Sequence, residues 1–215
     1  MVGRAALFLT FALLVVNAPQ VVAADSAAEL SATALQECEL GRRSADRNIR
    51  LAHFEKSEAL AKQALAKNDQ IADAHFALFC SVGEQMRIDG ESITSLVHFR
   101  RMMKALDRTL ELNPDHLDAL SSKGTLLVRL PFMMGGNEEK GEQMLRRVVQ
   151  LDPTAINARI ALAKVYASHG KNQEALSLAT EALDNAKAQQ RADLIPEAQA
   201  TVASLRNNRA SQLTP

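Results

Sequence analysis

The feature that most constrains this chain is a short segment that occurs twice, each time at the end of a strongly helical run. It reads Leu112-Asn113-Pro114 at its first occurrence and Leu151-Asp152-Pro153 at its second. Proline cannot continue a helix, and it biases the residue before it away from α geometry. A new amphipathic run starts near Leu117 and again near Ile156. Each segment therefore predicts a helix end followed by a helix start, which makes this part of the chain a series of antiparallel helices.

Small residues in the last such unit indicate how the helices pack. Ala163 and Tyr166 share one face of the first predicted helix, and Ala175, Ala179 and Ala182 share one face of the second. Small side chains let two antiparallel helices approach closely, while the tyrosine fills the space between layers. This spacing resembles the tetratricopeptide repeat (TPR). The resemblance covers about residues 57–185, and it implies an all-α stack of helix hairpins (an α-solenoid) whose concave face binds a peptide or a partner protein.

The preceding units follow the same pattern less regularly. Gly124 and Gly141 occupy the small positions of one unit, but extra residues separate its two helices. The units end near Asp69, Pro114 and Pro153, which are 45 and 39 residues apart. Because the standard period is about 34 residues, we expect irregular, elongated repeats. An Ala- and Leu-rich composition without tryptophan and with a single tyrosine also favours helices over a β-sandwich.

The two ends of the array need separate predictions. Residues 25–50 are expected to form a helix that pairs with the first unit, and Ser92 is expected to cap a helix from Ile93 to Leu112. Near the C-terminus an apolar stripe of Ala198, Val202 and Leu205 predicts a capping helix. The predicted organisation is a signal peptide at 1–24, a repeat domain at 25–206 and a flexible tail at 207–215. Within the repeat domain the predicted units are about 25–69, 70–114, 115–153 and 154–187, followed by a cap at 194–206.

The first residues have the pattern of a secretory signal peptide. Arg4 is the only charged residue before Asp25, an apolar run covers residues 5–16, and small residues stand before the predicted cleavage site after Ala24, with Ala23 as the alternative. The apolar run is shorter than the roughly 20 residues that cross a bilayer. We therefore expect a periplasmic or secreted protein without stable membrane insertion after cleavage.

Cys38 and Cys80 fall on different predicted helices. An exported protein permits a disulfide, but a bridge needs the two Cα atoms within about 7 Å. Small buried cysteines are also common in helical packing. Of these two possibilities we expect two buried free thiols, with the disulfide as the alternative.

Charge and motifs argue against several functions. The chain has 25 basic and 25 acidic residues, and its arginine pairs, such as Arg42-Arg43, are expected to lie on solvated helix faces rather than at phosphate sites. Its five histidines show no metal-ligand spacing, and neither a GxSxG segment nor a glycine-rich phosphate loop is present. We expect no nucleic-acid partner, no cofactor, no metal and no catalysis.

The segment between the helices of the third unit suggests a more specific resemblance. Leu130-Pro131 is followed by Phe132, Met133 and Met134 and then by paired glycines. Two interpretations stay open: these side chains cover the end of the hairpin, or they form an adaptable contact surface for a partner. With the export signal, the pattern over 126–153 is similar to the T component of TRAP transporters. That resemblance implies an accessory of small-solute uptake in the periplasm, which associates with a solute-binding protein.

The repeat pattern also predicts which side chains line the concave face. These positions lie on the first helix of successive units, and Arg129 and Lys164 among them could pair with a carboxylate of a bound chain. The predicted lining consists of Phe76, Cys80, Asp118, Ser121, Thr125, Val128, Arg129, Asn157, Ile160 and Lys164. The sequence thus predicts an exported, non-catalytic TPR-type interaction module or scaffold, with an accessory role in TRAP-type uptake as the alternative. An uptake accessory would need a lined pocket or tunnel rather than an open groove, and a through-going apolar channel would favour it.

Overall fold

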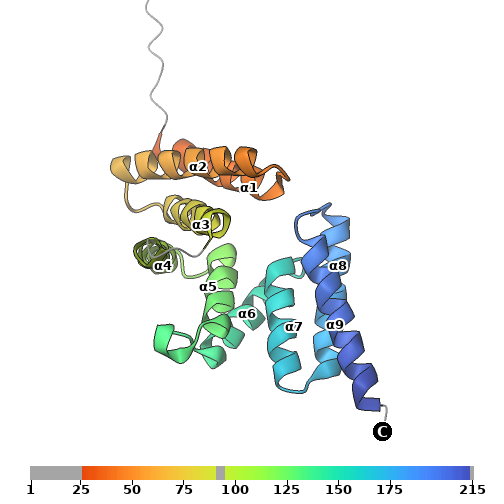
Figure 1. Cartoon of the computed structure of the whole chain (residues 1–215). Coiled ribbons are helices and arrows are strands. Elements are labelled where there is room, and N and C mark those ends of the chain that lie inside the picture. The colour runs from red at the N-terminus through yellow and green to blue at the C-terminus, as the bar shows by residue number, and fades with distance from the viewer. Residues whose placement is uncertain (1–25, 91–94, 214–215) are drawn as a thin grey trace, which may run out of the picture.

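The computed structural model describes residues 26–90 and 95–213, and within them the chain is all-α (Figure 1). The predicted signal peptide and the predicted capping residue Ser92 lie outside these residues. Successive helices pack as antiparallel pairs, which confirms the predicted fold class. The elements are α1 (Ala27–Arg43), α2 (Arg47–Lys67), α3 (Ala72–Asp89), α4 (Ser95–Leu112), α5 (Leu117–Arg129), the 3₁₀ turn η1 (Phe132–Met134), α6 (Glu138–Leu151), α7 (Ile156–Ser168), α8 (Asn172–Ala188) and α9 (Ile195–Leu213).

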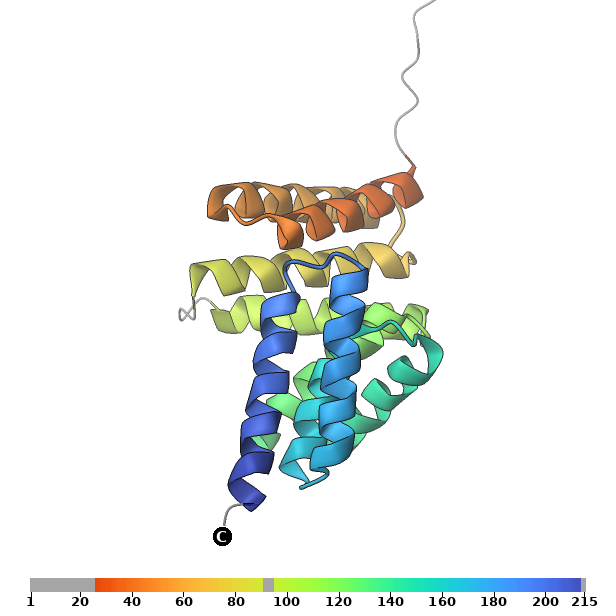
Figure 2. The same cartoon turned by 90° about the vertical axis from the view of Figure 1, so that its right-hand side faces the viewer.

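The stack changes direction near its middle. Helices α1 to α4 run crosswise to α8 and α9, as the second view shows (Figure 2). Contacts within each hairpin are extensive, whereas those between α4 and α5 are few. The helices α1 to α4 and the helices α5 to α9 of the described residues therefore meet at an angle. Helices α3, α5 and α7 line the inner side of that angle.

Side-chain turns end the helices where the sequence predicts. α4 stops at Leu112 and α6 at Leu151. The Asn113 side chain accepts a hydrogen bond from the Asp115 N–H at 3.1 Å, and the Asp152 side chain accepts one from Thr154 at 2.8 Å. Asn68 makes the same contact with Gln70 after α2. Such Asx turns offer the backbone an alternative to the next helical hydrogen bond, so each unit ends sharply.

Small residues lie at the helix crossings, as predicted. Ala175 and Ala179 are fully buried, and Gly124 is buried between α5 and α6. A Cβ atom on Gly124 would lie 3.0 Å from the Gly141 carbonyl oxygen, and one on Gly141 would lie 2.8 Å from that of Gly124. The two backbones are thus in direct contact, which excludes any larger side chain at either glycine position unless the helices move apart.

The N-terminal segment differs from the single helix expected over 25–50. It is divided into α1 and α2 by a break at residues 44–46. Asp46 causes the break, because its carboxylate accepts hydrogen bonds from the Asn48 and Ile49 N–H groups and so starts a new helix. The two helices then pack as a hairpin, with Gly41 against the ring of Phe54.

Helix α9 covers the end of the stack. Ala198, Val202 and Leu205 are buried against α7 and α8, as expected of a capping helix. The helix continues to Leu213, so residues 207–213 of the predicted flexible tail are helical.

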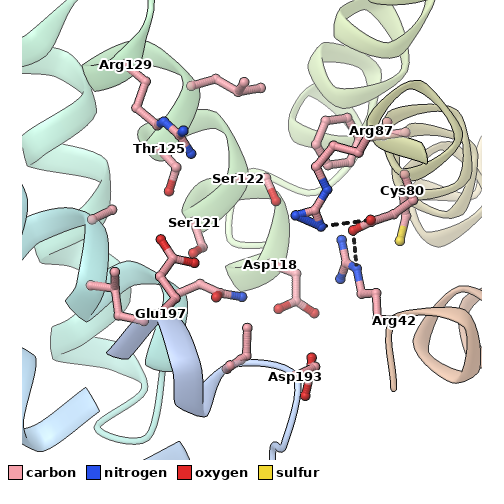
Figure 3. Close-up of a pocket in the computed structure, with 18 of the residues that line it drawn as sticks. Arg42, Cys80, Arg87, Asp118, Ser121, Ser122, Thr125, Arg129, Asp193 and Glu197 are labelled. Carbon is pink, nitrogen blue, oxygen red and sulfur yellow. Dashed lines mark hydrogen bonds and ion pairs between the residues drawn. The ribbon is translucent and has the colours of Figure 1, made fainter. Parts of the chain in front are cut away.

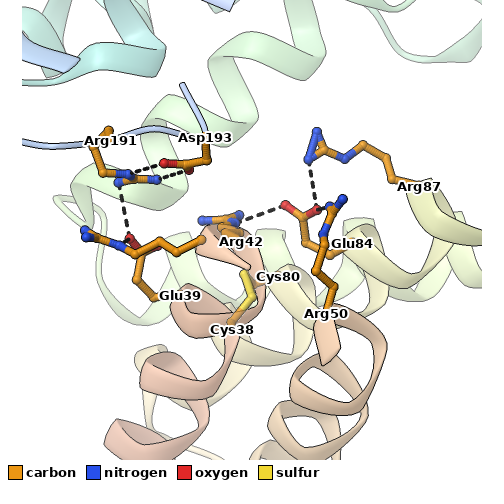
Figure 4. A network of polar contacts seen from close by, with 10 residues as sticks. Cys38, Glu39, Arg42, Arg50, Cys80, Glu84, Arg87, Arg191 and Asp193 are labelled. Atoms are coloured by element: carbon orange, nitrogen blue, oxygen red, sulfur yellow. Dashed lines mark hydrogen bonds and ion pairs between the residues drawn. A yellow bond between two sulfur atoms is a disulfide. The ribbon is translucent and has the colours of Figure 1, made fainter. Parts of the chain in front are cut away.

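The two cysteines form a disulfide, so the expectation of two free thiols is wrong (Figure 4). Packing of α1 on α3 places their Cα atoms 6.4 Å apart, within the distance that a disulfide requires. Both cysteines are buried together with Phe54. The bridge fixes the register of the first hairpin against the second.

Candidate functional site

The angle between the two halves of the stack contains a partly open cavity of about 1220 Å³ (Figure 3). One wall comes from the C-terminal part of α1, the start of α2 and the length of α3. The other wall comes from α5, α7, the loop between α8 and α9, and the first turn of α9. Charged and hydroxyl side chains from both walls project into the space between them (Figure 3).

The structure brings the predicted concave residues to this one cavity. Phe76 and Ile160 are almost fully buried, so they form its base rather than its accessible surface. Phe76 in addition stacks on Phe79, at 5.5 Å between ring centroids. All of the predicted residues line it: Phe76, Cys80, Asp118, Ser121, Thr125, Val128, Arg129, Asn157, Ile160 and Lys164.

Lys164 and Arg129 differ in their availability for a bound carboxylate. The Lys164 ammonium lies 2.6 Å from a carboxylate oxygen of Glu197, and both side chains are about half exposed. Such an exposed pair contributes at most about 1 kcal/mol, so it can exchange with a ligand. Arg129 is exposed and has no ion pair within the described part of the chain.

An arginine cluster on the opposite wall was not predicted. Glu84, whose side chain is only 9% exposed, lies 3.0 Å from the Arg42 Nε and 2.9 Å from an Arg87 nitrogen (Figure 4). A nitrogen of Arg50 lies 3.9 Å from the same carboxylate. The Arg42 side chain is 30% exposed and pairs with Glu84, whereas the neighbouring Arg43 is 49% exposed. The sequence contains one feature that could have indicated the Arg42–Glu84 pair: each of these residues stands four positions after a cysteine.

The loop between α8 and α9 closes the cavity against α1. Arg191 donates two hydrogen bonds to Asp193, at 2.9 and 2.6 Å, and lies 3.3 Å from Glu39 of α1 (Figure 4). Burial acts to raise the pKa of Asp193, but the hydrogen bonds and charge of Arg191 outweigh it and lower that pKa below its ordinary value. The hydrogen bonds to Asp193 also raise the pKa of Arg191. Both groups are therefore charged at neutral pH, and the Arg191–Glu39 ion pair joins the two ends of the stack.

The three apolar residues of the inserted loop do not cover the hairpin and do not reach the cavity. Phe132 is 90% exposed, Met133 96% and Met134 56%. The Pro131 carbonyl oxygen accepts hydrogen bonds from the Met134 and Gly136 N–H groups, which ties the backbone into a tight turn pointing outward. A Cβ atom on Gly136 would lie 1.8 Å from the Leu130 carbonyl oxygen, so this turn requires glycine there.

The helices offer neither a metal site nor a membrane span in the part of the chain that the structure describes. Within residues 26–90 and 95–213, no three His, Cys, Asp or Glu side chains are grouped so that they could hold a metal ion. None of the helices in these two ranges is both long and apolar enough for a membrane crossing.

The chain is similar to several solved structures. The TPR protein TTC0263 of Thermus thermophilus is 18% identical and aligns over 84% of this chain and 98% of its own, with a TM-score of 0.51. Yeast Tom70 is 18% identical over 88% of this chain and 42% of its own, with a TM-score of 0.48. YrrB, a TPR protein, is 16% identical over 85% of this chain and all of its own, with a TM-score of 0.44. No family model and no curated protein matches the sequence. The likeness to TTC0263 shows a TPR-like fold, and at this identity it shows the fold alone.

Proposed function

We propose that this protein is a non-catalytic interaction module that holds an extended segment of a partner protein in the cavity between the two halves of its stack. The observation that carries the proposal is the cavity itself, which at about 1220 Å³ exceeds the roughly 300–1000 Å³ of a typical small-molecule site. Helical repeats characteristically build extended concave surfaces of this kind.

The lining suits a polypeptide ligand. Ser121, Ser122, Thr125 and Asn157 provide donors and acceptors for the amide groups of an extended chain. They stand on α5 and α7, two packed helices that give them fixed positions. Polar groups that already hold fixed positions lose less conformational entropy when a ligand binds. A largely solvated cavity can therefore still bind a polypeptide specifically.

The proposal includes export to the periplasm or the exterior. Two observations support it: the signal-like pattern at residues 1–24, and the disulfide between Cys38 and Cys80. Structural disulfides persist in oxidising compartments and are rare in the cytosol.

A second candidate function is an accessory role in TRAP-type uptake, in contact with a solute-binding protein. The exposed Phe132, Met133 and Met134 favour it, because three such side chains outside the cavity form a surface that a protein could cover. The charged lining of the cavity, with Arg42, Arg87, Asp118 and others, favours the interaction module over an apolar solute channel.

Site-specific photocross-linking tests the first function. A benzophenone amino acid at Thr125 lies in the cavity, whereas one at Gln150 lies on α6 outside the lining. In the producing cell the probe at Thr125 should trap one defined partner segment that the matched probe at Gln150 does not trap. Equal trapping from both positions, or none from Thr125, would contradict the proposal.

A further inference from the structure

The cationic wall of the cavity holds more positive charge than its one central carboxylate can neutralise. Arg42, Arg50 and Arg87 converge on Glu84 from the end of α1, the start of α2 and the end of α3. All four side chains line the cavity. Three guanidinium groups stay protonated at any physiological pH, so this cluster carries a surplus of two positive charges.

Neighbouring carboxylates do not remove this surplus. Glu39 pairs with Arg43 at 2.8 Å and with Arg191 at 3.3 Å. Asp193 is engaged by Arg191, and the Asp46 carboxylate accepts hydrogen bonds from the first N–H groups of α2. Glu39 and Asp193 thus already have cationic partners, and the Asp46 carboxylate is directed at the start of α2.

The same holds for most carboxylates on the opposite wall. Glu197 pairs with Lys164, and Glu138 lies 2.6 Å from a ring nitrogen of His169. Asp118 is exposed, and its charge helps to raise the pKa of Arg191 on the loop before α9. Arg129 on the same helix is exposed and has no ion pair within the described residues. The cluster of Arg42, Arg50 and Arg87 around Glu84 therefore keeps its two surplus positive charges after the pairs on both walls are counted.

The cluster is also held in a fixed geometry. The disulfide joins Cys38 to Cys80, and Arg42 and Glu84 each follow one helical turn later on α1 and α3 (Figure 4). The bridge therefore sets the register of the Arg42–Glu84 pair. The Nε atom of Arg50 is buried without a hydrogen-bond partner among the described residues. Arg87 is 69% exposed at the mouth of the cavity and so can reorient toward a ligand.

We propose that this arginine cluster binds side-chain carboxylates of an acidic segment in the partner polypeptide. The inference rests on the proposed function and adds the chemistry of the segment. Guanidinium groups bind carboxylates through paired, charge-assisted hydrogen bonds. Glu84 stays at the centre of the cluster, and it repels a singly charged carboxylate less than a doubly charged phosphate. The segment therefore carries glutamate or aspartate where it passes between Arg42 and Arg87.

Fluorescence anisotropy with defined peptides tests this. The probes are labelled octaglutamate, octaglutamine and octalysine, added to the intact protein at low ionic strength. Octaglutamate should bind and the other two should not. Arg87→Gln should weaken octaglutamate binding about three- to fivefold, as expected for an exposed ion pair, and a further Arg42→Gln should bring the loss to about tenfold or more. Because Arg42 still pairs with Glu84 in the single variant, that variant should keep its fold.

The matched control is Arg108→Gln on α4, which removes the same charge outside the cavity lining. It should leave octaglutamate binding unchanged. Binding of octaglutamate that Arg87→Gln does not weaken, or that Arg108→Gln weakens equally, would overturn the inference. So would binding of octaglutamine as tight as that of octaglutamate. If the probe at Thr125 traps a segment whose capture is the same in Arg87→Gln, the proposed function stands and this inference fails; if Thr125 traps nothing, the proposed function itself fails.

Discussion

The Cys38–Cys80 disulfide should account for a large part of the stability of this protein. The bridge closes a loop with a sequence separation of 42 residues, and the loss of chain entropy that it imposes on the unfolded state corresponds to about 4 kcal/mol at room temperature. Domains of this size have a free energy of unfolding of about 5–15 kcal/mol, so the loss would be readily measured. The double variant Cys38→Ala/Cys80→Ala, which buries no new polar group, should unfold at a much lower urea concentration than the oxidised protein.

Two controls make this prediction specific to the bridge. Wild-type protein treated with a reductant should unfold near the double variant, and the reductant should leave the double variant unchanged. The reasoning fails if oxidised and reduced protein unfold at the same urea concentration. It also fails if thiol titration of protein recovered from its host under non-reducing conditions finds two free cysteines.

Three further predictions concern the packing of Ala179, the exposed loop at Phe132–Met134 and the Arg191–Asp193 ion pair. Ala179→Leu should lower the free energy of unfolding by about 1–3 kcal/mol, because Ala179 is fully buried at a helix crossing; an unchanged thermal melt would place the crossing elsewhere. Replacing Phe132, Met133 and Met134 together by serine should leave the melting temperature nearly unchanged, since these side chains are largely exposed; a clear drop would mean that they cover the core after all. The Asp193 carboxylate should titrate by NMR with a midpoint below the ordinary value of about 3.9. Because its pKa is lowered in the folded state, the stabilising contact with Arg191 should be present above the ordinary value and lost as the pH falls through the lowered midpoint. A midpoint at or above about 3.9 would contradict the ion pair.

The helix boundaries that the sequence predicts well are those with a local cause. Asn113-Pro114 and Asp152-Pro153 end their helices by short-range chemistry that needs no tertiary contact. The break between α1 and α2 has a local cause too, the cap at Asp46, but without a proline the surrounding helical pattern obscured it. The close approach of Gly124 and Gly141 was predictable because the repeat pattern reserves those positions for small residues.

The site was predictable only where it follows from a single repeat. Residues on α5 and α7 were placed in the cavity because each helix presents one face inward in every unit. Arg42, Arg50 and Arg191 were missed, because their position depends on how the elongated repeats turn the first hairpins across the last ones. The disulfide was missed for a different reason: the distance between Cys38 and Cys80 is set by the packing of α1 on α3 within the first half of the stack, and sequence spacing does not reveal it.

Blocking the cavity tests the central claim most directly. Thr125→Trp places a large side chain in the space between the two walls, and Gln150→Trp places the same side chain on α6 outside it. Quantitative mass spectrometry of proteins captured from the extract of the producing cell, with both variants and the wild type immobilised at equal amounts, compares their binding. If the cavity holds the partner segment, the protein that wild type and Gln150→Trp enrich should be lost from Thr125→Trp, while all three retain the same melting temperature. Undiminished enrichment on Thr125→Trp would show that the partner binds elsewhere on the molecule.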